Sequence, residues 1–93
     1  MSYEIIIQQE ALEDIQAAYA WYEEQLSGLG EDFLSELNTY LEKLRKNPQH
    51  YSFTFDDFRD VRLKCFPYLI VFRIVQSNVY INSVKHSKRK PQK

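Results

Sequence analysis

The side chains of this sequence that could do chemistry are mostly basic, and they lie in its C-terminal third. Arg62 and Lys64 stand two residues apart, so on a strand they would share one face of a sheet. Arg73 interrupts a run that is otherwise apolar. The remaining members follow the last apolar stretch: Lys85, His86, Lys88, Arg89 and Lys90. Such a set favours binding of an anion, either phosphate or an acidic protein segment.

The overall charge hides a strong asymmetry between the two halves of the chain. Residues 1–58 hold twelve Asp and Glu against three Lys and Arg, a net charge of −9. Residues 59–93 hold nine Lys and Arg against one Asp, a net charge of +8. Two interpretations follow: the basic half binds an anionic partner, or the two halves fold together and neutralise each other.

Several other kinds of chemistry are not expected. His50 and His86 stand alone, and Cys65 is predicted to pack on the apolar face of a strand, so we expect no metal site. Two glycines leave no room for a phosphate-binding loop or a nucleophile elbow, and no cofactor is expected. A lone cysteine, no long apolar run and no signal-like N-terminus predict a cytoplasmic protein without a membrane span.

The first half of the chain must supply the elements that support these residues. Tyr3, Ile5 and Ile7 predict a short, largely buried strand. A helix follows with the apolar stripe Leu12, Ile15, Tyr19, Tyr22 and Leu26, and with Glu10, Glu13 and Asp14 in its first turn. Residues 27–30 break the pattern with both glycines. A second helix is predicted from about residue 31 to Asn47-Pro48, with the stripe Phe33, Leu37, Tyr40 or Leu41, and Leu44. The two helices should form an antiparallel hairpin.

The second half of the chain has the alternating pattern of strands. Strands are predicted over residues 51–55, 61–65, 68–75 and 79–84, with turns at 56–57 and 77–78. Strands joined by such short turns should be antiparallel neighbours. The prediction is therefore one α+β domain over residues 1–93, with a C-terminal antiparallel β-sheet and a basic tail from about residue 87. The basic side chains would then gather at one end of the sheet.

Three aromatic residues of the helices are candidates for partner binding. Trp21 lies off the stripe of the first helix, Tyr22 lies on it, and Tyr40 flanks the stripe of the second helix. Packing within the hairpin is the favoured interpretation of each. A fringe of aromatic side chains beside a groove would still suit a partner helix.

A series of short motifs, in order, makes the chain similar to a known family. The series comprises Ala11–Ile15, Trp21–Gln25, Gly28-Leu29-Gly30, Phe33, Asn47-Pro48, Val61–Leu63, Phe66–Tyr68, His86, Arg89 and Pro91. In order and spacing it resembles the RelE/ParE superfamily of toxins from bacterial type II toxin–antitoxin modules, and the ParE-like branch in particular. The resemblance implies the same order of strand, helical hairpin and sheet, a role in plasmid stabilisation, and a cognate antitoxin that holds the toxin inactive in a hetero-oligomeric complex.

The resemblance leaves the cellular target open. RelE-like relatives cleave mRNA on the ribosome, and Arg62, Lys64, His86 and Arg89 could supply part of such a site. Leu69 and Ser87 stand where those ribonucleases place arginines, so no complete set is evident. ParE-like relatives instead inhibit DNA gyrase and are not nucleases. The binding candidates, for antitoxin or target, are Trp21, Tyr22, Tyr40, Arg62, Lys64, Arg73 and Arg89. A third reading is a relative that binds an antitoxin but is no longer toxic.

Overall fold

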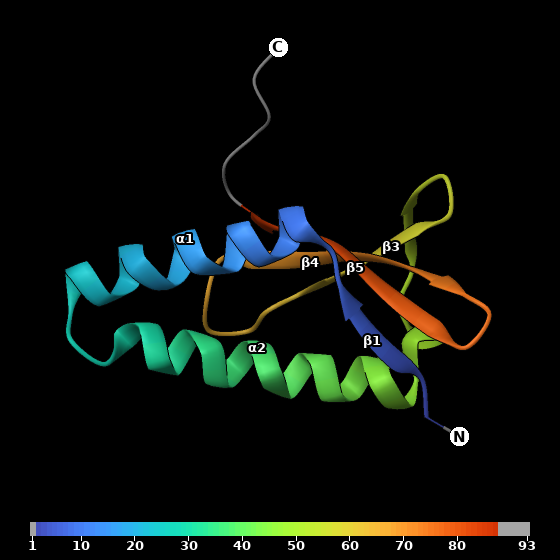
Figure 1. Cartoon of the computed structure of the whole chain (residues 1–93), viewed down its shortest axis with the longest axis horizontal. Coiled ribbons are helices and arrows are strands. Elements are labelled where there is room, and N and C mark those ends of the chain that lie inside the picture. Colours follow the sequence, from blue (N-terminus) through green and yellow to red (C-terminus); the bar gives the residue numbers. More distant parts are fainter. Residues whose placement is uncertain (1, 88–93) are drawn as a thin grey trace, which may run out of the picture.

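The computed structural model describes residues 2–87, and a helical hairpin lies along one side of a five-stranded sheet (Figure 1). The elements are β1 (Glu4–Ile7), α1 (Gln9–Gln25), α2 (Leu29–Lys46), the 3-10 turn η1 (Pro48–His50), β2 (Phe53–Phe55), β3 (Phe58–Arg62), β4 (Tyr68–Val75) and β5 (Asn78–His86). The predicted α+β order of strand, two helices and antiparallel sheet is confirmed.

The turn between the helices depends on both glycines, for different reasons. Gly28 has a φ of 93°, in the left-handed region that side chains with a Cβ avoid. Gly30 is buried, and a Cβ at that position would lie 2.7 Å from the Glu23 Cγ atom. The Glu23 carboxylate accepts hydrogen bonds from the backbone N–H groups of both glycines, at 3.1 and 2.9 Å. This tight turn lets α2 begin at Leu29, two residues earlier than predicted.

The buried face of α1 differs from the predicted stripe. The residues that α1 buries are Ala11, Ile15, Ala18 and Tyr22, whereas Leu12 and Leu26 are exposed. The two alanines have little side chain to separate the helix from the sheet, so the helix rotates to place them inward. In α2 the predicted stripe is confirmed: Phe33, Leu37 and Leu44 are buried, and Tyr40 and Leu41 are both partly buried against the core.

The sheet has the strand order β1-β5-β4-β3-β2. β2 to β5 are antiparallel neighbours, as predicted, and β4 is central. β1 instead pairs in parallel with β5, from Glu4 beside Asn78 to Ile7 beside Ile81. Because β1 lies at the edge of the sheet, it is not the largely buried strand that the sequence predicted, and Ile7 is exposed.

Strand ends differ from the predictions at several points. β3 ends at Arg62, so Cys65 lies in the β3–β4 loop and is exposed, not packed on an apolar strand face. The last turn is at Gln76-Ser77, and β5 extends to His86. Main-chain hydrogen bonds explain the longer strand, because pairing with β4 continues to Tyr68 beside His86. Alternation of apolar residues alone does not show how far a partner strand reaches.

The core lies between the hairpin and one face of the sheet. Its sheet residues include Val61, Ile70 and Val84, which stand side by side on β3, β4 and β5. Because successive side chains of a strand alternate, the neighbours of these residues point to the opposite face, which the hairpin does not cover. This opposite face is called the open face below.

Candidate functional site

The end of the sheet nearest the β3–β4 loop carries the first basic candidates on its open face. Arg62 on β3, Leu69 on β4 and Lys85 on β5 form one row across three strands. Each follows or precedes a buried core residue, so all three belong to the open face. Arg62 and Lys85 are exposed at the two ends of this row. The structure therefore brings two basic residues to the same end of the sheet, with an apolar residue between them.

Lys64 does not share a strand face with Arg62. The strand ends at Arg62, and Lys64 lies in the following loop, which bends toward α2. There it lines an open groove of about 400 Å³ whose other walls come from the exposed side of α2. The residues lining this groove are Asp32, Ser35, Glu36, Thr39, Tyr40, Lys43 and Lys64. The prediction that Arg62 and Lys64 act on one face is wrong because it required the strand to continue.

Tyr40 and Lys43 are neighbours in the lining of this groove. The Lys43 ammonium nitrogen lies 4.7 Å from the centre of the Tyr40 ring, a cation–π distance. Tyr40 also packs against the core, so it is only partly accessible to a partner.

His86 faces the hairpin side of the sheet. It stands beside Tyr68, and their ring centres are 5.2 Å apart. Tyr68 in turn packs against Tyr22 and Phe33 of the hairpin, with ring centres at 6.1 and 5.4 Å. His86 therefore belongs to an aromatic cluster beneath the helices, on the face opposite to Arg62. The structure does not bring Arg62, Lys64 and His86 to one point.

Arg73 lies toward the other end of β4. It is exposed on the open face, and its guanidinium nitrogen is 3.7 Å from an Asp57 carboxylate oxygen. Its guanidinium carbon also lies 5.7 Å from the centre of the Phe58 ring. Arg73 lies four positions from Leu69 along an extended strand, a span of about 13 Å. Convergence of all the basic strand residues at one end of the sheet is therefore wrong.

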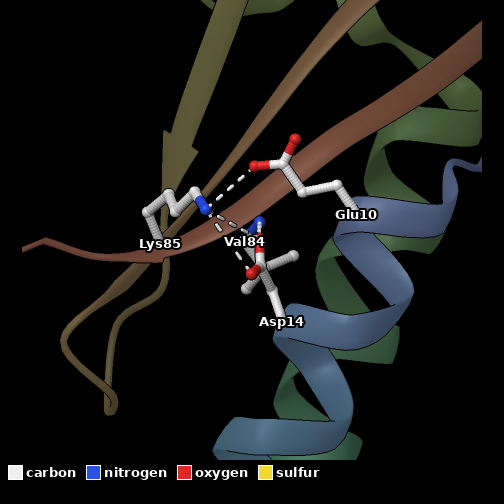
Figure 2. A network of polar contacts seen from close by, with 4 residues as sticks. All are labelled: Glu10, Asp14, Val84 and Lys85. Carbon is white, nitrogen blue, oxygen red and sulfur yellow. Dashed lines mark hydrogen bonds and ion pairs between the residues drawn. The ribbon is translucent and has the colours of Figure 1, made fainter.

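Lys85 is bound by acidic residues of α1, as Figure 2 shows. Its ammonium nitrogen is 3.0 Å from a Glu10 carboxylate oxygen and 3.4 Å from an Asp14 oxygen. The hydrogen bond to Glu10 raises the pKa of Lys85, and Asp14 adds to the effect. At this point the acidic and basic halves of the chain do neutralise each other. Among residues 2–87, Arg62 and Lys64 form no such ion pair.

The two adjacent aromatics of α1 have different environments. Trp21 is 56% exposed and touches Tyr22 edge-on, with ring centres 5.2 Å apart. Tyr22 is only 7% exposed, and burial raises the pKa of its hydroxyl. Tyr22 therefore serves the core, whereas Trp21 exposes a large apolar surface.

Sequence reasoning missed a second exposed aromatic feature on the β2–β3 hairpin. Phe53 and Phe55 are both more than half exposed. The Arg59 guanidinium carbon lies 3.9 Å from the Phe53 ring centre, and Arg59 also donates a hydrogen bond to the Tyr51 carbonyl at 2.7 Å. Phe55 packs against Phe58, with ring centres 5.0 Å apart. The short alternating run before Asp56-Asp57 predicted a strand, but it could not show that the strand is at the sheet edge.

Chemically, the described residues offer a dispersed basic surface. Within residues 2–87, no cluster of three or more His, Cys, Asp or Glu side chains could hold a metal ion. In the same range, no helix is both long and apolar enough to cross a membrane. Arg89, with Lys88 and Lys90, lies outside the described residues. The arrangement suits binding through charge and exposed aromatics better than a compact acid–base centre.

Comparison with known proteins places these features in a family. Residues 5–91 match the family described as the ParE toxin of the type II toxin–antitoxin system, parDE. No curated protein matches this sequence.

Two solved structures have a similar fold. One is a chain of the chromosomal ParDE TA system from P. aeruginosa, with a TM-score of 0.83 and 13% identity, covering 94% of this chain and 98% of that chain. The other is a chain of the intact E. coli RelBE toxin–antitoxin complex, with a TM-score of 0.71 and 17% identity, covering 95% of this chain and 100% of that chain. At these identities the two structures establish the fold alone. The family match spans nearly the whole sequence, and the chain therefore belongs to the ParE toxins of type II toxin–antitoxin systems.

Proposed function

We propose that this chain arrests growth by inhibiting DNA gyrase through protein–protein contact, and that a cognate antitoxin neutralises it. The observation that carries the proposal is the family match over residues 5–91. The geometry of the basic residues in the described part of the chain adds support, because Arg62, Lys64 and His86 are dispersed over a surface rather than assembled into a catalytic set.

The same geometry disfavours an mRNA endoribonuclease. Cleavage by a 2′-hydroxyl group needs a base, an acid and phosphate-stabilising groups around one phosphate. Here Arg62 lies on the open face, Lys64 lies in the groove beside α2, and His86 packs against Tyr68 on the hairpin side. Leu69 separates Arg62 from Lys85 in the row where a further arginine would complete a phosphate site.

An antitoxin partner agrees with the solved structures of similar fold, both of which are toxin–antitoxin systems by their descriptions. The exposed Arg62 and the ring of Trp21 suit a partner segment that combines acidic and apolar side chains. We propose Trp21, Arg62 and Lys64 as the leading contact residues, followed by Tyr40 and Arg73. Tyr22 is the weakest of the candidates because it is buried.

The decisive experiment incubates the purified chain with gyrase and supercoiled plasmid and measures supercoiling and cleavage complexes. We expect inhibition that the co-purified antitoxin abolishes. Arg62→Ala should weaken it, whereas Arg45→Ala on α2, whose partner is Glu42 on the same helix, serves as the matched control.

Two results would count against this function. Intact gyrase activity together with mRNA cleavage in a translating extract would select the ribonuclease. Intact gyrase and intact mRNA, with normal growth on induction, would select a non-toxic relative that binds antitoxin.

A further inference from the structure

Within residues 2–87, one edge of β5 has no partner strand for part of its length. β1 pairs with β5 only from Asn78 to Ile81, and the Gln8 N–H donates the last main-chain hydrogen bond, to the Ile81 carbonyl. From there the chain turns into α1, which runs past the rest of this edge (Figure 1). An open strand edge exposes main-chain donors and acceptors that invite another strand.

A side chain of α1 takes up one main-chain donor on this edge. The Val84 N–H donates to the Asp14 Oδ2 atom at 3.0 Å. On its other side Val84 stands beside Ile70 of β4, so the bond to Asp14 lies where the next strand would be. The side chain of Asp14 is only 21% exposed, so most of it is shielded from water at this contact. A carboxylate oxygen thus replaces the carbonyl oxygen of a missing strand.

Lys85 explains how two like charges can stand together at this point. Glu10 and Asp14 are four residues apart on α1, a spacing at which two carboxylates destabilise a helix. The Lys85 ammonium group lies between them, at 3.0 Å from Glu10 and 3.4 Å from Asp14 (Figure 2). Glu10 is the acidic residue in the first turn of α1, and Asp14 lies beyond that turn. Attraction to the helix dipole therefore does not explain the position of Asp14.

We propose that Asp14 is a latch that fixes α1 to β5 and closes the open edge of β5 to strand addition. Lys85 is a positioning residue for the latch, since it holds the Asp14 carboxylate against the Val84 N–H group. The proposal concerns the architecture of the chain and does not depend on whether gyrase is the target.

Amide hydrogen exchange of the full chain, followed by NMR, tests the first half of this proposal. Asp14→Ala should speed exchange of the Val84 amide about tenfold or more relative to the amides of β4, a factor equivalent to about 1.4 kcal/mol. Asp14→Asn keeps an acceptor and should have a smaller effect. Glu10→Gln is the matched control, because it weakens the ion pair with Lys85 but leaves the acceptor in place. If the Val84 amide of the Asp14→Ala variant exchanged no faster relative to the β4 amides than in the unchanged chain, the latch would be overturned.

A measurement on the unchanged chain covers the case in which Asp14→Ala fails to fold. A scalar coupling across the hydrogen bond, from the Val84 amide nitrogen to the Asp14 carboxyl carbon, should be detectable, and its absence would overturn the latch. Sedimentation tests edge closure: folded Asp14→Ala should associate at concentrations at which Glu10→Gln stays monomeric. An Asp14→Ala variant that stays monomeric would refute this second half.

Discussion

Trp21 and Tyr22 are neighbours on α1, and their substitution should affect different properties of the protein. Tyr22 is 7% exposed, and its ring centre lies 5.5 Å from that of Phe33 and 5.0 Å from that of Phe66. Trp21 is 56% exposed, and its ring meets that of Tyr22 edge-on, with ring centres 5.2 Å apart. Tyr22→Ala should therefore reduce stability, whereas Trp21→Ala should reduce binding to the partner.

The magnitudes follow from the burial of each ring. Truncating a buried aromatic ring to alanine costs roughly 3–5 kcal/mol. For a domain whose total stability is roughly 5–15 kcal/mol, that is a large share. With a urea dependence of about 2 kcal/mol/M, a loss of about 4 kcal/mol lowers the unfolding midpoint by about 2 M. Tyr22→Phe keeps the ring contacts and should cost about 1 kcal/mol or less.

Trp21→Ala should cost about 1 kcal/mol or less, because more than half of the ring is already in water. Tryptophan is over-represented among interface residues whose truncation costs about 2 kcal/mol or more, so binding to the antitoxin or to gyrase should weaken about thirtyfold. Urea unfolding followed by circular dichroism measures the stability of each variant. Titration calorimetry with the antitoxin and the gyrase assay measure binding.

Equal reductions of the urea midpoint in Tyr22→Ala and Trp21→Ala would contradict this expectation. Equal midpoints would mean that exposure does not separate the roles of the two rings. A Trp21→Ala variant that binds antitoxin and inhibits gyrase like the unchanged chain would remove Trp21 from the proposed contact surface.

Three further predictions concern the α1–α2 turn and the β3–β4 loop. Glu23→Ala removes the carboxylate that accepts hydrogen bonds from two N–H groups of the turn, and it should lower stability by about 1–2 kcal/mol. The control is Glu24→Ala at the adjacent exposed residue, which should change stability by less than about 0.5 kcal/mol. Equal urea midpoints for the two variants would contradict this prediction. Gly28→Ala should cost about 1–2 kcal/mol because of the left-handed backbone, although no atom stands in the way, and an unchanged midpoint would rule out that strain. A hydrogen bond to the Glu36 carboxylate, and then its negative charge, raise the pKa of the Cys65 thiol, so less thiolate is present at a given pH. Glu36→Gln should therefore speed alkylation of Cys65 at pH 8. An unchanged rate would show that Glu36 does not set the reactivity of the thiol.

The local pattern of residues determined most of the fold. Apolar spacing and the glycine pair predicted the hairpin, and alternation predicted the four antiparallel strands that the structure confirms. These features depend on neighbours within a few residues, so they can be recognised from the sequence alone. The alternation could not show where a strand loses its partner, and for this reason it placed Cys65 on a buried strand face. The convergence predicted for the basic residues failed for other reasons: Arg73 lies four positions along β4 from Leu69, and His86 faces the hairpin side of the sheet.

The basic composition of the C-terminal third and the order of its motifs were also evident in the sequence, and the family match agrees with them. Only the tertiary structure decided how these charges are used. The parallel docking of β1 leaves the edge of β5 to α1, so Lys85 is held by Glu10 and Asp14, while Arg62 stays exposed on the open face. The residues that meet at the contact between α1 and β5 lie far apart in the sequence: Asp14 and Val84 are separated by 70 positions. Packing of the whole chain brings them together, and no local spacing reports it.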